Sequence, residues 1–146
     1  MLKARNLFIF FIVTFFLVIG QAVVKADIRF QPSDEVIEFM KEADQALEYQ
    51  DYNKASYYLQ RAAERGYPEA QMKIGLLYKN GWGVAKNYDE AIYWVRMSAD
   101  QRFPRGLYEL GLIYKEKDEM MEANYWFNMA YLYGDNELKS LIDAQI

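Results

Sequence analysis

Three segments of the chain share one pattern of apolar and polar positions. In each segment, apolar or small residues recur at positions i, i+3, i+4 and i+7. This spacing places them on one side of an α-helix and predicts three amphipathic helices. Small residues stand at both ends of each stripe, so a neighbouring helix can approach closely. The stripes are Ala55, Tyr58, Leu59 and Ala62; Ala91, Trp94, Val95 and Ser98; and Ala123, Trp126, Phe127 and Ala130.

These segments belong to a longer internal repeat. A shift of 36 residues aligns 67–68 with 103–104 and 75–76 with 111–112, and further along the chain the best shift falls to 32. The middle repeat carries a longer connector, 79–86, than the other two. A repeat of this length is typical of a stack of supersecondary units, and here each unit is predicted to be a pair of antiparallel helices.

Proline and glycine positions refine the predicted helices. Pro68 and Pro104 follow turns, and a first helical turn tolerates their missing N–H, so they are predicted to mark helix starts. Gly75 and Gly111 fall within the helices that follow. A glycine there costs about 1 kcal/mol relative to alanine, and we expect close helix packing to be the reason for both.

The N-terminus has the pattern of an export signal. Lys3 and Arg5 precede an uncharged apolar run, 7–19, as in a secretory signal peptide. Small residues favour cleavage after Ala26, and an uncleaved anchor over 7–24 is the alternative. Both interpretations send the rest of the chain across the membrane. We therefore expect an exported protein, which is periplasmic in a Gram-negative bacterium, with secretion or membrane anchoring as the alternatives.

Charge and residue types narrow the chemistry. The first 26 residues hold three of the 17 Lys and Arg and none of the 21 Asp and Glu, so residues 27–146 carry a net charge of −7. Such an acidic body disfavours nucleic acid as a partner. Cysteine and histidine are absent, which excludes disulfides, thiolate metal sites and a cysteine nucleophile and removes the commonest general base. We expect no metal, no cofactor, and membrane contact only through an uncleaved N-terminal segment.

Two motifs resemble functional sites, a phosphate-binding loop and a pair of catalytic carboxylates. The segment 81–83 has the glycines of a phosphate loop, but it lacks the further glycine, the Lys-Ser/Thr pair and the preceding strand, so we interpret it as a helix connector. Asp118, Glu119 and Glu122 could act as paired carboxylates. In the first turn of a helix such residues complement the helix dipole, and we interpret them in that way. No catalytic residue is predicted.

The chain resembles the Sel-1-like repeat family, a relative of the tetratricopeptide repeat. The resemblance rests on a Gly-x-Gly-Val loop ahead of an Ala-x-x-Trp helix, and it is strongest between Ala62 and Tyr114. The first and third repeats lack that loop and look more like plain tetratricopeptide units. The residues that carry the resemblance are 62–66, Ala70, 74–78, 81–84, Ala91 and Trp94.

The resemblance implies an all-α fold, a right-handed helix-turn-helix superhelix of about three repeats with a C-terminal capping helix. First helices would line a concave face and second helices a convex one. We therefore expect four parts of the chain: a signal peptide or anchor at 1–26, a short segment at 27–34, the repeats at 35–134 and the capping helix at 135–146.

The concave face is the predicted partner-binding site. Its residues combine apolar anchors with a charged rim, which suits a protein surface. Two alternatives stay open at this point: Leu76 and Leu112 merely pack between repeats, and Lys79 and Lys115 are solvated helix ends. The predicted site residues are Met72, Leu76, Lys79, Tyr108, Leu112 and Lys115, with Glu69 and Arg105 at the edge.

The resemblance implies a non-catalytic scaffold that binds a protein. Exported relatives suggest two partner types: a toxic effector neutralised by its immunity protein, and an envelope or host protein engaged by an adaptor. The rival classes are an enzyme that uses fold-assembled carboxylates on cell-wall polymer and a module for structural self-assembly.

Overall fold

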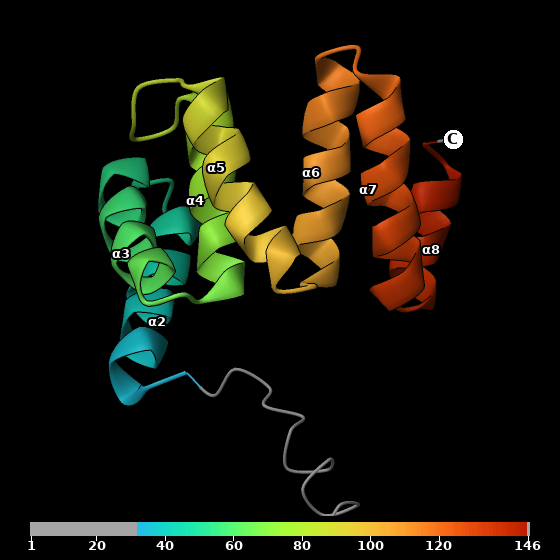
Figure 1. The fold of residues 1–146 in the computed structure, drawn as a ribbon. Helices are drawn as coiled ribbons and strands as arrows, with labels where there is room; N and C mark the ends of the chain where they lie inside the picture. Colours follow the sequence, from blue (N-terminus) through green and yellow to red (C-terminus); the bar gives the residue numbers. More distant parts are fainter. Residues whose placement is uncertain (1–31, 146) are drawn as a thin grey trace, which may run out of the picture. The chain divides into compact units, whose positions relative to one another are not determined.

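Within residues 32–145, which the computed structural model describes, the chain forms α-helices and no β-strand (Figure 1). This confirms the predicted all-α class. The signal-peptide prediction for residues 1–26 lies outside the described residues. Among the described helices, none is long and apolar enough to span a bilayer. The helices are α2 (Asp34–Glu48), α3 (Tyr52–Glu64), α4 (Pro68–Asn80), α5 (Tyr88–Asp100), α6 (Pro104–Glu116), α7 (Met120–Tyr133) and α8 (Asn136–Asp143).

Six of the seven described helices begin at a side-chain cap or at a proline, which lacks the N–H that a first turn leaves free. Asp51 and Asp135 accept hydrogen bonds from backbone N–H groups three residues ahead, at 3.1 and 2.9 Å. Asn87 caps α5 in a similar way. Pro68 and Pro104 occupy the first turns of α4 and α6, where no side chain caps the helix. The prediction that proline marks helix starts is thus confirmed.

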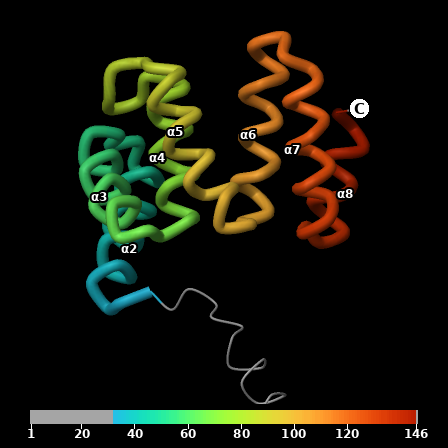
Figure 2. The backbone as a smooth tube through the Cα atoms, in the orientation of Figure 1, coloured from blue at the N-terminus to red at the C-terminus, as the bar shows by residue number. Residues whose placement is uncertain are grey.

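The helices pack as consecutive pairs. α2 lies against α3, α4 against α5 and α6 against α7, while α3 contacts α4 and α5 contacts α6 (Figures 1 and 2). α8 closes the series on α7. On one side of the stack, α4 also contacts α6 and α6 contacts α8, and the Lys73–Asp44 ion pair links α4 to α2. We call the row formed by α2, α4, α6 and α8 the first-helix face.

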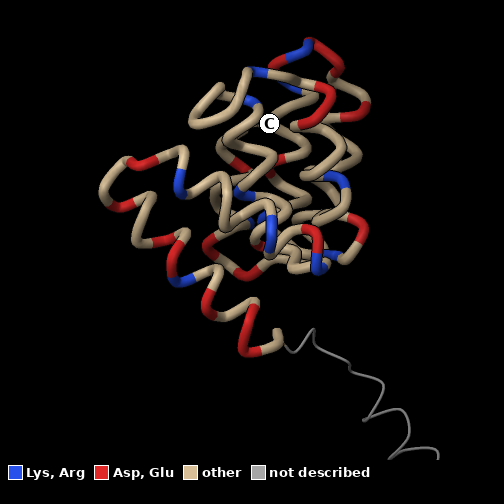
Figure 3. The backbone as a smooth tube through the Cα atoms, turned by 90° about the vertical axis from the view of Figure 1, so that its left-hand side faces the viewer, with Lys and Arg blue, Asp and Glu red and all other residues tan. Residues whose placement is uncertain are grey.

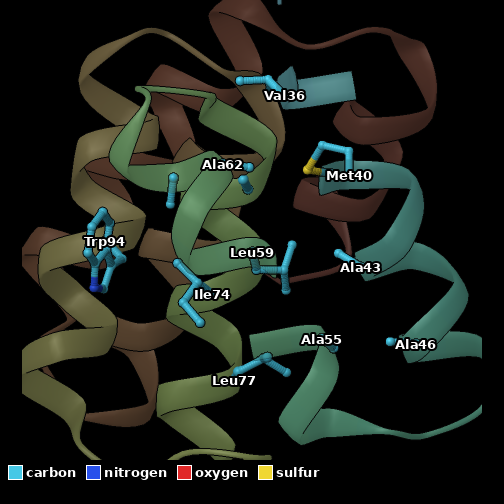
Figure 4. Close-up of a cluster of buried hydrophobic side chains, with 12 residues drawn as sticks. Val36, Met40, Ala43, Ala46, Ala55, Leu59, Ala62, Ile74, Leu77 and Trp94 are labelled. Atoms are coloured by element: carbon cyan, nitrogen blue, oxygen red, sulfur yellow. The ribbon is translucent and has the colours of Figure 1, made fainter. Parts of the chain in front are cut away.

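Buried side chains form two clusters that together run along the repeats. The first joins α2, α3 and α4 and includes Trp94 from α5 (Figure 4). The second joins α5, α6, α7 and α8 around Leu110 and Phe127. The predicted stripes of the second helices supply both clusters, with Tyr58 and Trp126 only partly buried. The apolar period read from the sequence therefore identifies the packed sides of these helices.

The helical glycines Gly75 and Gly111 lie where the two helices of a pair are in close contact. A Cβ atom added to Gly75 would lie 2.5 Å from Val95 Cγ2, and one added to Gly111 would lie 2.6 Å from Phe127 Cδ1. Real Cβ contacts are longer than this, so neither site accommodates a side chain without movement of its neighbour. The expected reason for these glycines, close helix packing, is confirmed.

The connector after α4 packs back onto the first repeat. Gly81 ends α4 with a φ of 75°, a left-handed C-cap. Trp82 stacks on Tyr52 with ring centroids 5.1 Å apart. Gly83 has a φ of 68°, and a Cβ there would lie 2.1 Å from the Tyr52 carbonyl oxygen. The segment 81–83 is thus a helix connector, as predicted, and it ties the middle repeat to the first.

The acidic residues before α7 are arranged differently from the expectation. Asp118 lies in the preceding turn with a φ of 64°, and Glu119 is the N-cap residue without a side-chain capping bond. Glu119 instead pairs with Lys117 at 2.5 Å. Only Glu122 lies in the first turn of α7. The turn between α6 and α7 needs a residue with left-handed backbone just after the C-cap Lys117, and Asp118 fills this position. Asp118 therefore lies outside the first turn of α7.

We predict that Gly111→Ala destabilises the fold. Alanine raises helix propensity by about 1 kcal/mol, but overpacking against Phe127 costs about 1–3 kcal/mol, so the urea midpoint should fall. The three nearest atoms all belong to the Phe127 side chain, so Gly111→Ala should cost less in a Phe127→Leu background. Urea unfolding followed by circular dichroism measures both effects. Asn124→Ala, at an exposed helical position, is the control, and additive effects would contradict the prediction.

Candidate partner-binding face

Lysine side chains connect neighbouring helices of the first-helix face. Lys73 on α4 pairs with Asp44 on α2 and with Glu69 on its own helix, both at 2.7 Å. The two carboxylates outweigh the effect of burial and raise the pKa of Lys73. Glu69, a predicted site residue, is therefore already engaged by a cation. Pairs this exposed stabilise by about 0–1 kcal/mol, so they mainly hold side chains in place.

Lys79 and Lys115 occupy equivalent positions, and each reaches a group beyond its own helix pair. Lys79 Nζ lies 2.8 Å from Glu116 Oε1, and the Lys79 side chain is only 14% exposed. Lys115 Nζ lies 2.7 Å from the carbonyl oxygen of Gln145, after α8. Both residues stand in the last turns of their helices. They are not solvated helix ends, however, because each one bridges two repeats.

The apolar residues predicted for this face divide into two groups. Met72 and Tyr108 are buried, 6% and 8% exposed, so their side chains belong to the core and not to an open groove. Burial also raises the pKa of the Tyr108 hydroxyl. Leu76 and Leu112 are half-buried, and Leu112 packs on the second core cluster. Of the four apolar residues predicted for this face, the two leucines are the ones that keep partly exposed surface.

Arg105 lines a pocket at the end of the first-helix face. The pocket has a volume of about 350 Å³ and lies between the start of α6, the end of α7 and the side of α8. Arg105 is exposed, and Leu141 is 42% exposed. The sequence identified Arg105 but not the pocket, because α8 forms the opposite wall. The lining residues are Phe103, Pro104, Arg105, Tyr133, Asp135, Glu137, Leu138 and Leu141.

Glu109 is a partly buried carboxylate that sequence reasoning did not select. Burial raises the pKa of Glu109, and the nearby cations Lys79 and Arg105 oppose this shift. Glu109 stands 36 residues after Lys73, so the same position of the first helix carries opposite charges in successive repeats. This reversal of charge is visible in the sequence and could have identified Glu109 as a candidate site residue. The carboxylate lies close to the charged residues Lys79, Arg105 and Glu116, whose charges affect its pKa.

The charges on the molecule are mixed, with an acidic end. Every described helix except α7 carries both basic and acidic residues, while α2 carries six carboxylates and one lysine (Figure 3). No group of three or more Asp or Glu within residues 32–145 is arranged to hold a metal ion. The face is therefore a surface of bridged charges, two leucines and a pocket, and it suits contact with another macromolecule.

We predict that Glu109→Gln stabilises the protein at neutral pH. Because the pKa of Glu109 is raised on folding, its contribution to stability falls as pH rises from the unfolded pKa through the folded one. The variant should therefore have the higher urea midpoint at pH 7, and this advantage should disappear at a pH below the unfolded pKa. Glu137→Gln, on exposed α8, corrects for the loss of one negative charge. An equal gain in both variants, or a gain that persists in acid, would contradict this prediction.

Comparison with known proteins agrees with this architecture. The family model of the Sel1 repeat matches residues 44–67, 68–103 and 104–139, well over half of the chain. The second and third matches begin at the prolines that start α4 and α6. The first and third repeats, which lack the Gly-x-Gly-Val loop, match as well. No curated protein matched the sequence.

A solved structure shares the fold. The crystal structure of a Sel1 repeat protein from Oxalobacter formigenes aligns with a TM-score of 0.57 and 26% sequence identity. The alignment covers 62% of this chain and 28% of the other, so this chain corresponds to just over a quarter of that protein. Sel1 repeats generally mediate protein–protein interactions. With three matched repeats, the chain belongs to the Sel1 repeat family and is built as a helical scaffold for protein interaction.

Proposed function

We propose that this protein is an exported, non-catalytic binding protein that holds one protein partner on its first-helix face and thereby neutralises a secreted toxic effector. The observation that carries the proposal is the set of lysine bridges across that face. Lys73 and Lys79 are held by carboxylates on a neighbouring first helix, at 2.7 and 2.8 Å, and Lys115 is held by the carbonyl oxygen of Gln145, just after α8, at 2.7 Å. A surface whose long side chains are already ordered loses less entropy when a partner docks.

The face also offers places where a partner can be anchored. Leu76 and Leu112 retain apolar surface between the bridges. The pocket beside Arg105 is large enough to take a partner side chain, and the exposed guanidinium can pair with a carboxylate at its entrance. Apolar anchors within a charged rim are the arrangement found at protein interfaces. The partner is therefore expected to insert a side chain at Arg105 and Leu141.

Electrostatics favours a partner with a basic surface. Residues 27–146 carry a net charge of −7, and α2 places carboxylates at one end of the first-helix face (Figure 3). Opposite charges accelerate association and give it a strong dependence on salt. An acidic inhibitor of this kind acts by covering the active site of a basic toxin, and it needs no catalytic residue of its own.

The proposed inhibitor must be exported to meet its toxin. The basic and apolar regions of residues 1–26 have the pattern of a secretory signal. A toxin delivered to the cell envelope is neutralised there, so an immunity protein against it must also leave the cytoplasm. A small chain suffices, because inhibition requires only that one surface of the toxin be blocked.

We predict that the double variant Arg105→Glu/Leu141→Asp binds the partner about 10- to 100-fold more weakly, because it reverses a charge and removes an anchor at one pocket. The partner is captured with the full chain from secreted proteins of the same organism, identified, purified and titrated by calorimetry. Lys86→Glu/Tyr93→Asp makes the same two types of change away from this face and should bind normally. Equal affinities of both double variants would move the binding site elsewhere.

The neutralising role has its own test. Cells that lack the protein should be outcompeted by wild-type siblings in dense co-culture. The full chain should rescue them, whereas a chain without residues 2–26 should not. Equal growth of the deletion strain and wild type would refute neutralisation. A captured partner without toxic activity would point instead to an adaptor role in the envelope.

A further inference from the structure

The outer side of α7 carries an exposed apolar stripe. Met121, Tyr125 and Leu132 are 82%, 56% and 69% exposed. Together with the exposed residue Asn128, they stand at positions i, i+4, i+7 and i+11, which form one continuous line along a helix. The buried side of α7, with Ala123 and Phe127, faces the core. The helix is thus apolar on two sides, and the described residues cover only one of them.

The stripe is specific to the third repeat. The equivalent positions of α5 hold Asp89, Tyr93, Arg96 and Asp100, and those of α3 hold Asn53, Tyr57, Gln60 and Glu64. The tyrosine is common to all three helices, with exposures of 54–56%. The positions four before and seven after this tyrosine are polar in the first two repeats, whereas in the third repeat they hold Met121 and Leu132. The repeat fold therefore does not require these two apolar residues.

The charges around the stripe favour a second copy of this chain as its occupant. Residues 27–146 carry a net charge of −7, so two copies repel each other when they meet at random. α7 is the exception, since Glu122 is the only charged residue among its 14 residues. Glu122 shares a flank of the helix with Tyr133, eleven residues further on. Arg102 lies over the ring of Tyr133, 5.5 Å from its centroid, so this flank is acidic at one end and basic at the other.

We propose that two copies of the protein form an antiparallel, two-fold symmetric dimer through α7. The stripe is self-complementary in this arrangement, as a two-fold interface requires. Met121 of one copy packs on Leu132 of the second copy, and Tyr125 packs beside Asn128, with each contact made twice. Like flanks meet in an antiparallel pair, so Glu122 comes level with the Tyr133 and Arg102 end of the second copy. A parallel pair lacks this charge pairing.

The size of the contact makes the dimer reversible. A helix of 14 residues is about 21 Å long, and one pair of such helices buries less than the roughly 1,600 Å² of a standard interface. We therefore expect a dissociation constant on the order of 10 μM. The residues of the stripe do not line the pocket beside Arg105, and Tyr133, on the flank of α7, is the one residue of α7 that does. Variants at Met121 and Leu132 therefore test the dimer separately from variants at Arg105 and Leu141.

Sedimentation equilibrium of the full chain tests the association. Between about 1 and 100 μM, the average mass should rise from the 17.3 kDa of one chain toward twice that value. Met121→Asp/Leu132→Asp should remain monomeric. It should also fold normally, because α5 carries aspartate at both equivalent positions. Asn53→Asp/Gln60→Glu adds the same charge on α3 and should still dimerise, which controls for general repulsion.

Disulfide trapping tests the antiparallel arrangement. The chain has no cysteine, so introduced thiols can pair only with each other. In Met121→Cys/Leu132→Cys, each thiol faces its counterpart on the second copy, and oxidised glutathione should give a covalent dimer. Either single variant should cross-link poorly, because the two identical positions lie about 16 Å apart along the helix axis. Intrachain closure is excluded by the same separation.

Three results would overturn the proposal. A chain that stays monomeric across the concentration range excludes the dimer. Association that persists in Met121→Asp/Leu132→Asp places the contact elsewhere, for example on the apolar N-terminal segment. Efficient cross-linking of Met121→Cys alone indicates a parallel pair. None of these results affects binding at Arg105, which the pocket variant tests separately.

Discussion

The close approach of the two helices within each repeat is the constraint on which the rest of the structure depends. Gly75 and Gly111 carry no side chain at the point where Val95 and Phe127 press against them, with a hypothetical Cβ at 2.5 and 2.6 Å. This contact fixes the separation and rotation of the helix pair. The apolar stripe of the second helix can then meet the first helix of the next repeat, and stacking extends the core along the chain.

Stacking in turn decides which polar groups can meet. The first helices form one row, so a lysine near the end of one helix reaches a carboxylate or carbonyl oxygen on the next, as Lys79 reaches Glu116 and Lys115 reaches Gln145. The same row partly buries Glu109 and raises its pKa. These groups add little stability individually. They order a surface that would otherwise consist of flexible side chains.

The two sides of the stack therefore have different properties. The first-helix face combines bridged charges, two half-buried leucines and a pocket, which we associate with a foreign partner. The second helices share an exposed tyrosine at one equivalent position, and in α7 alone the positions four before it and seven after it are apolar. A scaffold with one face for a partner and another for its own copy can hold two partners at once. This doubles the effective number of binding sites without enlarging the chain.

Local spacing and the properties of single residues were enough to predict the helices, their proline-marked starts, the close packing at the glycines and the family. It also indicated the packed side of each second helix. The stacking of the helices, in contrast, buries Met72 and Tyr108, brings Lys79 and Lys115 within reach of Glu116 and Gln145, places α8 opposite Arg105, and leaves one side of α7 uncovered by the described residues. A period along one helix identifies its apolar side, whereas burial and pairing depend on which neighbouring helix covers that side.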